Sequence, residues 1–410
     1  MKSRRAPGLI FVLLTLFIDV MGVGLSNPVL PTLIGQYVDN ISTTSVYFGA
    51  VMTLYALMLF LFSPIQGGLS DRFGRKPLLL LSLLGTGLSY IALTLAPSLP
   101  WIFAAQMMNG LTGASVAVTG AYIADISGPE ERSKNFGLLG ATIGIGWVLG
   151  PALGGLLGSI GLRVPFLIAA ILSFLNLLYG LLFVPESHRP EHRQSFSWVR
   201  ANPIGSLLFL RKNAAVLGLA MVIFCNDLAL QCLISTWVLF TSYKFQWTTI
   251  EVGLSLALLG LVTAIVQGGV MRHIISRFGE RRTIVIGLVL CLIGYLLYAV
   301  VDQGWLMYGV ILLNGFDFVV KPTAQGILSM QVNAREQGAL QGAIASQTAF
   351  TSIIGPFVAT GLFGYFVSAQ APFHLPEVPF LLGAGLFAIA LWLAIMTFSN
   401  KALWEKQSIS

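Results

Sequence analysis

The chain has 410 residues, of which 56% are hydrophobic and only 10% are charged, and its formal net charge is +7. A soluble domain carries about 25% charged residues, so this composition excludes a soluble enzyme, a disordered chain and a collagen-like fibre. Long apolar runs without polar alternation also disfavour a β-barrel. The composition therefore predicts an all-α membrane protein that crosses the bilayer many times.

Twelve apolar runs approach the length of about 20 residues that a spanning helix needs. They cover residues 8–27, 46–66, 77–96, 101–124, 136–158, 165–184, 214–241, 250–271, 283–301, 305–329, 339–367 and 377–398. The one longer connection, at 185–213, is predicted to be a cytoplasmic loop. It divides the chain into an N-terminal six-helix bundle at 1–184 and a C-terminal six-helix bundle at 214–410.

The basic residues are distributed unevenly among the loops. All Lys and Arg residues except Arg163, Lys244 and Lys321 lie at the termini or in alternate loops. Because basic residues concentrate on the cytoplasmic side of a membrane, both termini are predicted to be cytoplasmic. These clusters are short and lack interleaved aromatic residues, which argues against a nucleic-acid partner. No metal-ligand spacing and no phosphate-binding loop occurs, so we expect no metal and no nucleotide cofactor.

The two halves of the sequence resemble each other. A single offset aligns residues 72–74 with 277–279 and residues 150–151 with 355–356. Such matches predict two duplicated halves in the same topology, related by an axis along the membrane normal. Transporters of this design bind substrate between the halves near the middle of the bilayer.

The loop after the second run reads Gly-Gly-Leu-Ser-Asp-Arg-Phe-Gly-Arg-Lys-Pro over 67–77. It resembles the G-x-x-x-D-R-x-G-R-[RK] hallmark of the major facilitator superfamily, whose fold has twelve helices in two pseudo-symmetric six-helix bundles. Asp71 is predicted to pair with a basic residue and to close the cytoplasmic side. The predicted gate consists of Gly67, Asp71, Arg72, Gly74, Arg75, Lys76 and Asp125. The second copy, at 276–282, lacks the aspartate, so we expect an asymmetric gate.

The fifth run carries a pattern of small residues. Glycines at these spacings let helices approach closely, and the proline adds a bend. The pattern also resembles an element of the superfamily's proton-coupled exporters, so the resemblance implies export. The residues are Gly146, Gly150, Pro151, Gly154 and Gly155.

Further segments narrow the resemblance. Residues 19–31, 123–125, 235–240 and 337–342 are similar to the tetracycline-efflux branch of the drug:proton antiporters, and the similarity covers nearly the whole chain. The resemblance implies proton-coupled drug efflux across the cell inner membrane, and with it antibiotic resistance.

Four positions depart from that branch. Tetracycline exporters have ionisable side chains in helices 3, 4, 8 and 9 where this chain has Ser89, Gln106, Thr263 and Cys291. The helix 8 glutamine is retained as Gln267. These departures argue against tetracycline itself as the substrate, and they require another residue to carry the proton.

Acids inside the spans are the candidates for this role, because charges at membrane depth are costly and usually functional. The proton-coupling candidates are Asp19, Asp227 and Asp317. The substrate-cavity candidates are Gln106, Asn109, Asn226, Gln231, Gln267, Asn314 and Lys321. Asp317 and Lys321 are four residues apart and share a helix face. Either they neutralise each other, or Asp317 accepts a proton with an affinity that Lys321 sets.

The sequence thus predicts a secondary transporter that exports an amphipathic small molecule in exchange for protons, by alternating access. The proton gradient supplies the energy, the bilayer surrounds a monomer, and no cofactor is needed. Lys321 hints at an anionic compound. The alternatives are a carrier of one metabolite, such as a sugar, siderophore or organic acid, and a membrane receptor or scaffold that transports nothing. No nucleophile–base constellation indicates an enzyme.

Overall fold

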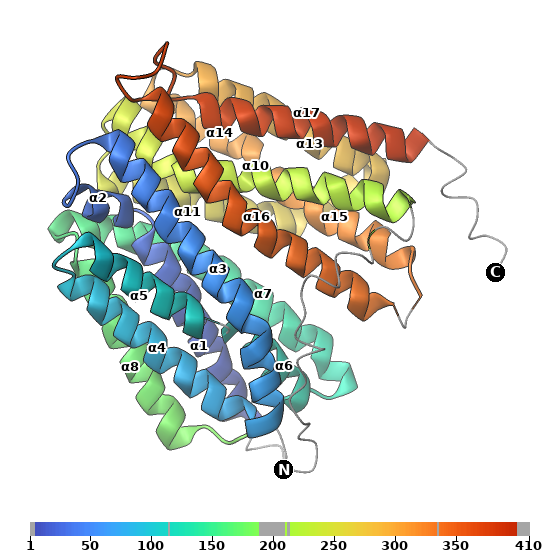
Figure 1. Cartoon of the computed structure of the whole chain (residues 1–410). Coiled ribbons are helices and arrows are strands. Elements are labelled where there is room, and N and C mark those ends of the chain that lie inside the picture. Colours follow the sequence, from blue (N-terminus) through green and yellow to red (C-terminus); the bar gives the residue numbers. More distant parts are fainter. Residues whose placement is uncertain (1–4, 114, 188–209, 211–213, 334–335, 400–410) are drawn as a thin grey trace. The chain divides into compact units, whose positions relative to one another are not determined.

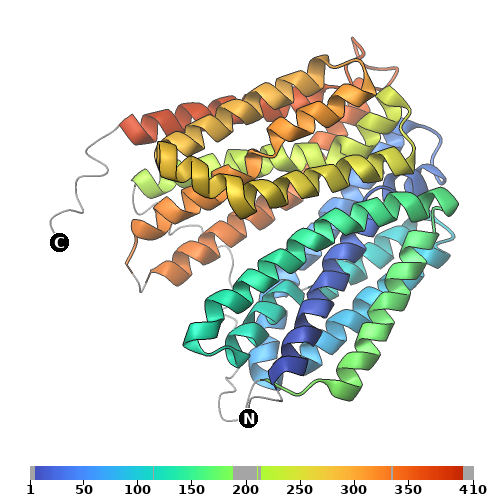
Figure 2. The same ribbon diagram turned by 180° about the vertical axis from the view of Figure 1, so that it is seen from behind.

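The structure is a computed structural model, and it describes residues 5–113, 115–187, 210, 214–333 and 336–399. Regular structure in these ranges is helical. Contacts divide the chain into two compact units (Figures 1 and 2). The first comprises Met1–Asn40, Val51–Asn202 and Trp247–Gly260, and the second Ile41–Ala50, Pro203–Gln246 and Leu261–Ser410.

The first unit is built on α1, which packs against α7 and α8, while α4 packs against α5 and α8. The first residues of α3 belong to the second unit. Its helices are α1 (Arg5–Ser26), α2 (Leu30–Gly35), α3 (Ile41–Phe73), α4 (Arg75–Leu95), α5 (Leu99–Thr112), α6 (Ser115–Ile126), α7 (Pro129–Ile160) and α8 (Val164–Phe183).

In the second unit α10 packs against α15, α16 and α17, and α13 packs against α15 and α17. Most of α11, up to Gly260, belongs to the first unit. The elements are α10 (Ala214–Phe245), α11 (Thr249–Ile265), the π-helix Val266–Val270, α12 (Met271–Phe278), α13 (Glu280–Val300), α14 (Gly304–Asn314), α15 (Asp317–Met330), α16 (Gln337–Phe366) and α17 (Val378–Ser399).

Within the described residues, 11 stretches are long and apolar enough to cross a membrane. The predicted span 101–124 is not among them, because it consists of α5 and α6 with a break at Gly113. The predicted span 305–329 is also interrupted, between α14 and α15. The two breaks lie at nearly corresponding positions of the repeated halves. In transporters, paired interruptions of this kind mark the substrate or ion site.

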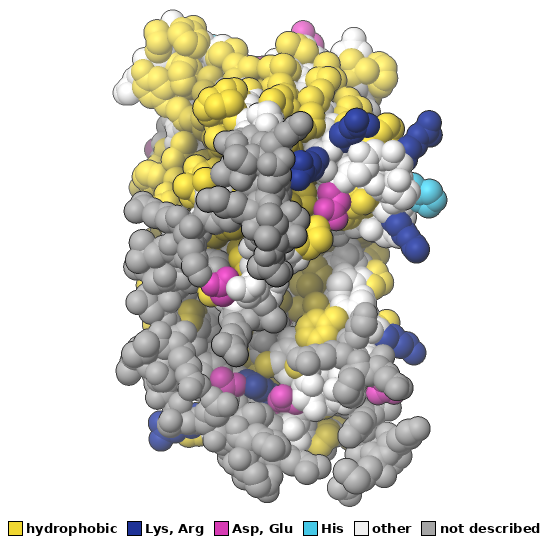
Figure 3. Space-filling view, turned by 90° about the vertical axis from the view of Figure 1, so that its right-hand side faces the viewer, with side chains coloured by type: hydrophobic (Ala, Val, Ile, Leu, Met, Phe, Trp, Pro, Cys, Tyr) yellow, Lys and Arg dark blue, Asp and Glu magenta, His cyan; other side chains and the backbone are white. Residues whose placement is uncertain are grey.

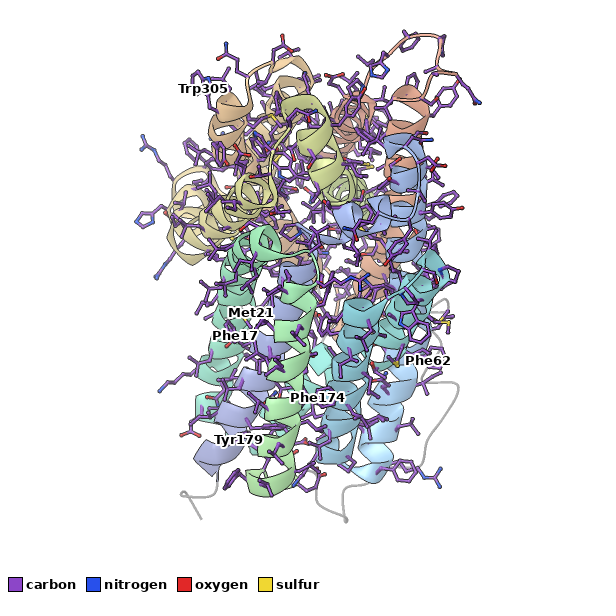
Figure 4. The ribbon with its side chains drawn as sticks, turned by 90° about the vertical axis from the view of Figure 1, so that its left-hand side faces the viewer. Phe17, Met21, Phe62, Phe174, Tyr179 and Trp305 are labelled. Atoms are coloured by element: carbon purple, nitrogen blue, oxygen red, sulfur yellow. The ribbon has the colours of Figure 1, made fainter. Side chains whose placement is uncertain are left out.

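The outer surface of the helices is apolar, as expected for a chain surrounded by lipid. On α8, Leu175 and Leu182 are exposed, whereas Phe166 and Ala170 are buried. Figure 4 shows the ring of Tyr179 on the same helix, where it contacts the ring of Phe11. Helix α8 therefore presents leucine outward and packs through smaller residues and aromatic rings inside.

The backbone repeats as the sequence does. Gly74 links α3 to α4 with φ 109°, and Gly279 links α12 to α13 with φ 76°. Glycine is favoured here because positive φ strains residues that carry a Cβ. Pro151 and Pro356, at matching positions, both lie inside helices. The two-bundle repeat predicted from the sequence is therefore visible in the turns and in the proline positions.

The units do not follow the predicted boundaries everywhere. Residues 41–50 group with the second unit and residues 247–260 with the first. The cause is close packing by glycine: the Gly49 backbone lies against Thr360 of α16, and that of Gly253 against Gly155 of α7. Most of the predicted loop at 185–213 lies outside the described residues.

Candidate functional site

An ion pair joins helices of the second unit, with its acid buried and its Lys321 side chain 27% exposed. The Lys321 ammonium donates to Asp227 Oδ2 at 2.7 Å and to Thr348 Oγ1 at 2.8 Å, and the Thr348 hydroxyl lies 2.8 Å from the same carboxylate oxygen. Asp227 is only 4% exposed. The three side chains come from α10, α15 and α16. They form a closed, neutral triangle, which lets a charged pair persist away from water.

The structure corrects the predicted pairing of Asp317 with Lys321. Lys321 pairs with Asp227 instead. Asp317 is 3% exposed, and no ion pair to it is found among the described residues. A pair four residues apart on a helix contributes about 0.2–0.5 kcal/mol, which is less than the cost of leaving Asp227 unpaired and buried.

Asp317 is the first residue of α15, directly after the break that follows α14. Its carboxyl faces the amide of Asn226 on α10 and the thiol of Cys291 on α13. The break therefore brings an acid without an ionic partner into the interior of the unit.

Of the other predicted polar residues in the second unit, the two asparagines are deeply buried and the two glutamines donate hydrogen bonds. Asn226 and Asn314 are almost fully buried, at 2% and 1% exposure. Gln231 donates to Ser352 Oγ at 2.9 Å. Gln267 lies in the π-helix and donates to the Phe318 carbonyl at 3.4 Å. Single π-helical turns inside α-helices are frequent at functional sites.

The first unit holds its own polar cluster. Asp19 on α1 is half-buried, and Tyr55 and Tyr90 are its electrostatic neighbours. On α5 the Asn109 amide donates to Gln106 Oε1 at 3.4 Å, and both side chains are buried. Each unit thus contains at least one membrane-depth acid together with buried amide side chains.

A charged network surrounds Arg75 at the start of α4. Its guanidinium contacts Asp71 at 2.5 Å and Asp125 at 3.2 Å, and it donates to Ser70 Oγ at 2.6 Å. Figure 3 shows one face of the molecule, on which Lys, Arg, Asp and Glu side chains reach the surface. The loop motif therefore ties the end of α3, the start of α4 and the end of α6 through one arginine.

Sequence reasoning missed Glu186, which follows α8. Its carboxylate accepts the backbone N–H groups of Arg75 at 2.8 Å and Lys76 at 3.1 Å. It thereby satisfies N–H groups at the start of α4 that no turn of helix can satisfy. Gly74 has no Cβ, which leaves room for this carboxylate. The sequence did contain a signal for this contact. An acid directly follows the apolar run 165–184, and basic residues directly precede the run 77–96.

The remaining gate residues have local roles. The Lys76 ammonium donates to the Leu181 carbonyl at 3.2 Å, and the Arg72 guanidinium lies 5.1 Å from the centre of the Phe73 ring. Gly67 has open space where a Cβ would stand. In the second copy Arg277 lies 5.7 Å from the Phe278 ring, and the predicted asymmetry of the gate stays a prediction.

The glycines of the predicted motif lie on the face of α7 that packs against other helices. A Cβ on Gly150 would lie 2.8 Å from Gly24 Cα of α1, and one on Gly154 would lie 2.8 Å from Leu25 Cα. Gly146 faces Val20, and Gly155 faces Gly253 of α11. Pro151 also contacts Gly24. Most of these neighbours are backbone atoms, which cannot move aside as a flexible side chain can. The packing therefore leaves little room for a larger side chain at these positions.

We expect Gly150→Ala to destabilise the protein by about 1–3 kcal/mol, because the added methyl group overpacks against the α1 backbone. Gly144→Ala is the control on the same helix, since a Cβ there meets nothing within 4 Å. Thermal unfolding in detergent, followed by a thiol-reactive dye on the buried cysteines, measures both variants. Equal unfolding temperatures for the two variants would contradict the packing argument.

An apolar helical surface, a repeated two-unit architecture and a buried ionisable cluster at a helix break define a polytopic membrane protein of the secondary-transporter class. Residues 12–356 and 219–408 match the family described as Major Facilitator Superfamily, and the chain belongs to this family. The family supports a transporter rather than an enzyme.

Its relatives include drug-resistance proteins. The chain is 40% identical over 392 residues to the tetracycline resistance protein, class C, of Escherichia coli, with 95% of this chain and 96% of the relative covered. It is 35% identical over 366 residues to the class B protein of Escherichia coli, covering 89% and 90%. The crystal structure of the human organic anion transporter MFSD10 (TETRAN) has a similar fold, with a TM-score of 0.70, 23% identity and coverage of 95% and 99%.

Proposed function

We propose that this chain is a proton-coupled antiporter that exports an amphipathic drug-like molecule by alternating access. One observation carries the proposal. At the break in the predicted tenth span, the buried Asp317, which is in no ion pair among the described residues, lies near the neutral pair of Asp227 and Lys321. A buried acid without an ionic partner can exchange a proton without breaking an ion pair, so it is suited to carry one across the membrane.

Asp317 is the best candidate among the three predicted acids. Asp227 is already neutralised by Lys321. Asp19 interacts with other groups of the first unit, and its electrostatic neighbours are tyrosines. Asp317 also faces Cys291, the position at which tetracycline exporters carry an acid. We infer that the acid has moved from one helix to its neighbour while staying in the same part of the unit.

The charge of the substrate follows from the sign of the coupling. In an antiporter, substrate and proton must oppose each other's binding. A positive group near Asp317 favours the ionised carboxylate, whereas a negative group favours the protonated acid. Lys321 is engaged by Asp227, so an anion would have to break an existing pair. We therefore propose a cationic, amine-bearing amphipathic substrate and no longer an anionic one.

The remaining features complete the proposal. The protein lies in the cell inner membrane as a monomer with both termini in the cytoplasm, as the distribution of Lys and Arg suggests. The inward proton gradient supplies the energy without a cofactor. The ion pairs of Arg75 with Asp71 and Asp125 act as a cytoplasmic gate that breaks and reforms during transport.

Everted membrane vesicles provide the test. When their lumen is acidified, we expect them to accumulate amphipathic quaternary amines, which passive protonation cannot trap, and we expect a protonophore to abolish the accumulation. Right-side-out vesicles should not accumulate these amines. Tetracycline should not accumulate, because four ionisable positions of the tetracycline exporters are absent from this chain. Accumulation that persists with the protonophore would refute proton coupling.

A further inference from the structure

A groove lies on the surface of the second unit, along the end of α11, the π-helix and α12. Its volume is about 470 Å³. Ile265, Gly269 and Val270 line its apolar part, and His273 and Arg277 line its basic part. The proposed transport mechanism makes no use of this groove, and the two parts together indicate an amphipathic ligand.

Glycine leaves the groove open. Gly268 and Gly269 both lie in the π-helix, and a Cβ on either would meet no other part of the described chain within 4 Å. Ile265 is 56% exposed, and none of the residues of α12 is buried. The described residues therefore offer these apolar side chains no cover of their own.

The length of the span places the groove at the edge of the bilayer. The stretch Thr249–Phe278 has 30 residues, which is about 45 Å of helix, whereas the hydrocarbon core is about 30 Å thick. Helix α12 is the end of this stretch, so its last turns reach beyond the core. In a centred span, Ile265 and Gly269 lie at the depth of the acyl chains, and Arg277 lies at the depth of the headgroups.

The basic part of the groove lies in a segment with a surplus of positive charge. Residues 271–282 contain four arginines and one histidine but only one acid, Glu280. Arg277 is exposed, and no ion pair to it is found among the described residues. The His273 ring is held at the groove because its Nδ1 donates to the Gly269 carbonyl at 3.1 Å. A guanidinium can bind two oxygens of one phosphate, so this part suits an anionic phosphate group.

Position and charge together select the occupant. The groove lies toward the side that the distribution of Lys and Arg predicts to be cytoplasmic, where anionic lipids attract basic segments. A free phosphate would match only the basic part of the groove, and an uncharged chain would match only the apolar part.

We propose that the groove binds one anionic phospholipid. Its acyl chain lies along the apolar part, and its phosphate contacts the side chains of His273 and Arg277. This inference goes beyond the proposed function and does not depend on it.

Native mass spectrometry of the full chain in detergent counts bound lipids directly. We expect phosphatidylglycerol to bind at least about tenfold more tightly than phosphatidylcholine with the same acyl chains, since the choline brings a positive charge toward the arginines. Arg277→Gln should weaken binding of phosphatidylglycerol about fivefold, the contribution of one basic residue at an anionic surface. Arg272→Gln, the control, removes the same charge from an exposed position outside the groove and should stay within about twofold of wild type, because distant exposed charges are screened.

A second pair of variants tests the apolar part. Gly269→Phe fills the groove with a ring, whereas Gly268→Phe places the same ring at the adjacent position of the π-helix. Since a Cβ at either position meets open space, both variants should unfold at the wild-type temperature. Gly269→Phe should abolish the phosphatidylglycerol adduct, and Gly268→Phe should keep it.

Competition separates a lipid from other occupants. Glycerol 3-phosphate, which carries the phosphate without acyl chains, should not displace the lipid, and displacement would overturn the proposal in favour of a free phosphate. The proposal also fails if phosphatidylcholine binds as tightly, if Arg272→Gln and Arg277→Gln weaken binding equally, or if Gly269→Phe keeps the adduct. A dimer of the chain that Arg277→Gln dissociates, in place of a lipid adduct, would identify a second copy as the occupant and overturn the proposal as well.

Discussion

Asp317→Asn should abolish transport driven by a pH gradient while the protein stays folded and binds substrate. Asparagine has the shape of a protonated aspartate but cannot release a proton. Removing a group that takes part directly in proton transfer typically costs about 100-fold or more in rate. We therefore expect gradient-driven uptake into everted vesicles to fall by about 100-fold, and the residual rate to be independent of external pH.

The controls for Asp317→Asn measure its stability, its substrate exchange and the effect of the same substitution at Asp19. Because Asp317 is in no ion pair among the described residues and has little exposure, the neutral amide should fit without loss of stability, and the unfolding temperature should match that of wild type. Substrate counterflow should persist. Asp19→Asn, prepared in the same way, should retain most of the gradient-driven rate. If Asp19→Asn loses coupling and Asp317→Asn keeps it, the assignment of the proton carrier is wrong.

Much of the fold could be predicted from residue patterns. Apolar length located the spans, and the offset between the halves aligned Gly74 with Gly279, which both have a positive φ in the structure. The breaks in the predicted fourth and tenth spans were not anticipated, because Thr112-Gly113 and Asn314-Gly315 are compatible with a continuous helix in an apolar run. Hydropathy does not record where a helix within such a run ends.

The candidate site was predictable in composition but not in pairing. Membrane-depth acids are rare, so Asp227, Asp317 and Lys321 could be selected from cost alone. Spacing along one helix suggested that Lys321 pairs with Asp317, yet the lysine reaches α10. Thr348, which completes the triangle, is one of many threonines and carries no local signal. Side-chain partners from different helices require the three-dimensional arrangement.

Lys321→Met should destabilise the protein by about 3 kcal/mol, because it leaves the Asp227 carboxylate buried with only the Thr348 hydroxyl as a polar partner. Methionine keeps the length of the lysine stem, so the loss measures charge and not volume. The double variant Asp227→Asn/Lys321→Met removes both charges and should recover to within about 1 kcal/mol of wild type, since apolar or neutral replacements of a buried pair are often tolerated. Thermal unfolding in detergent of Asp227→Asn, Lys321→Met and the double variant gives the coupling energy between the two charges directly. Additive losses would mean that the pair contributes nothing in the fold, and the neutral triangle that leaves Asp317 as the free acid would have to be abandoned.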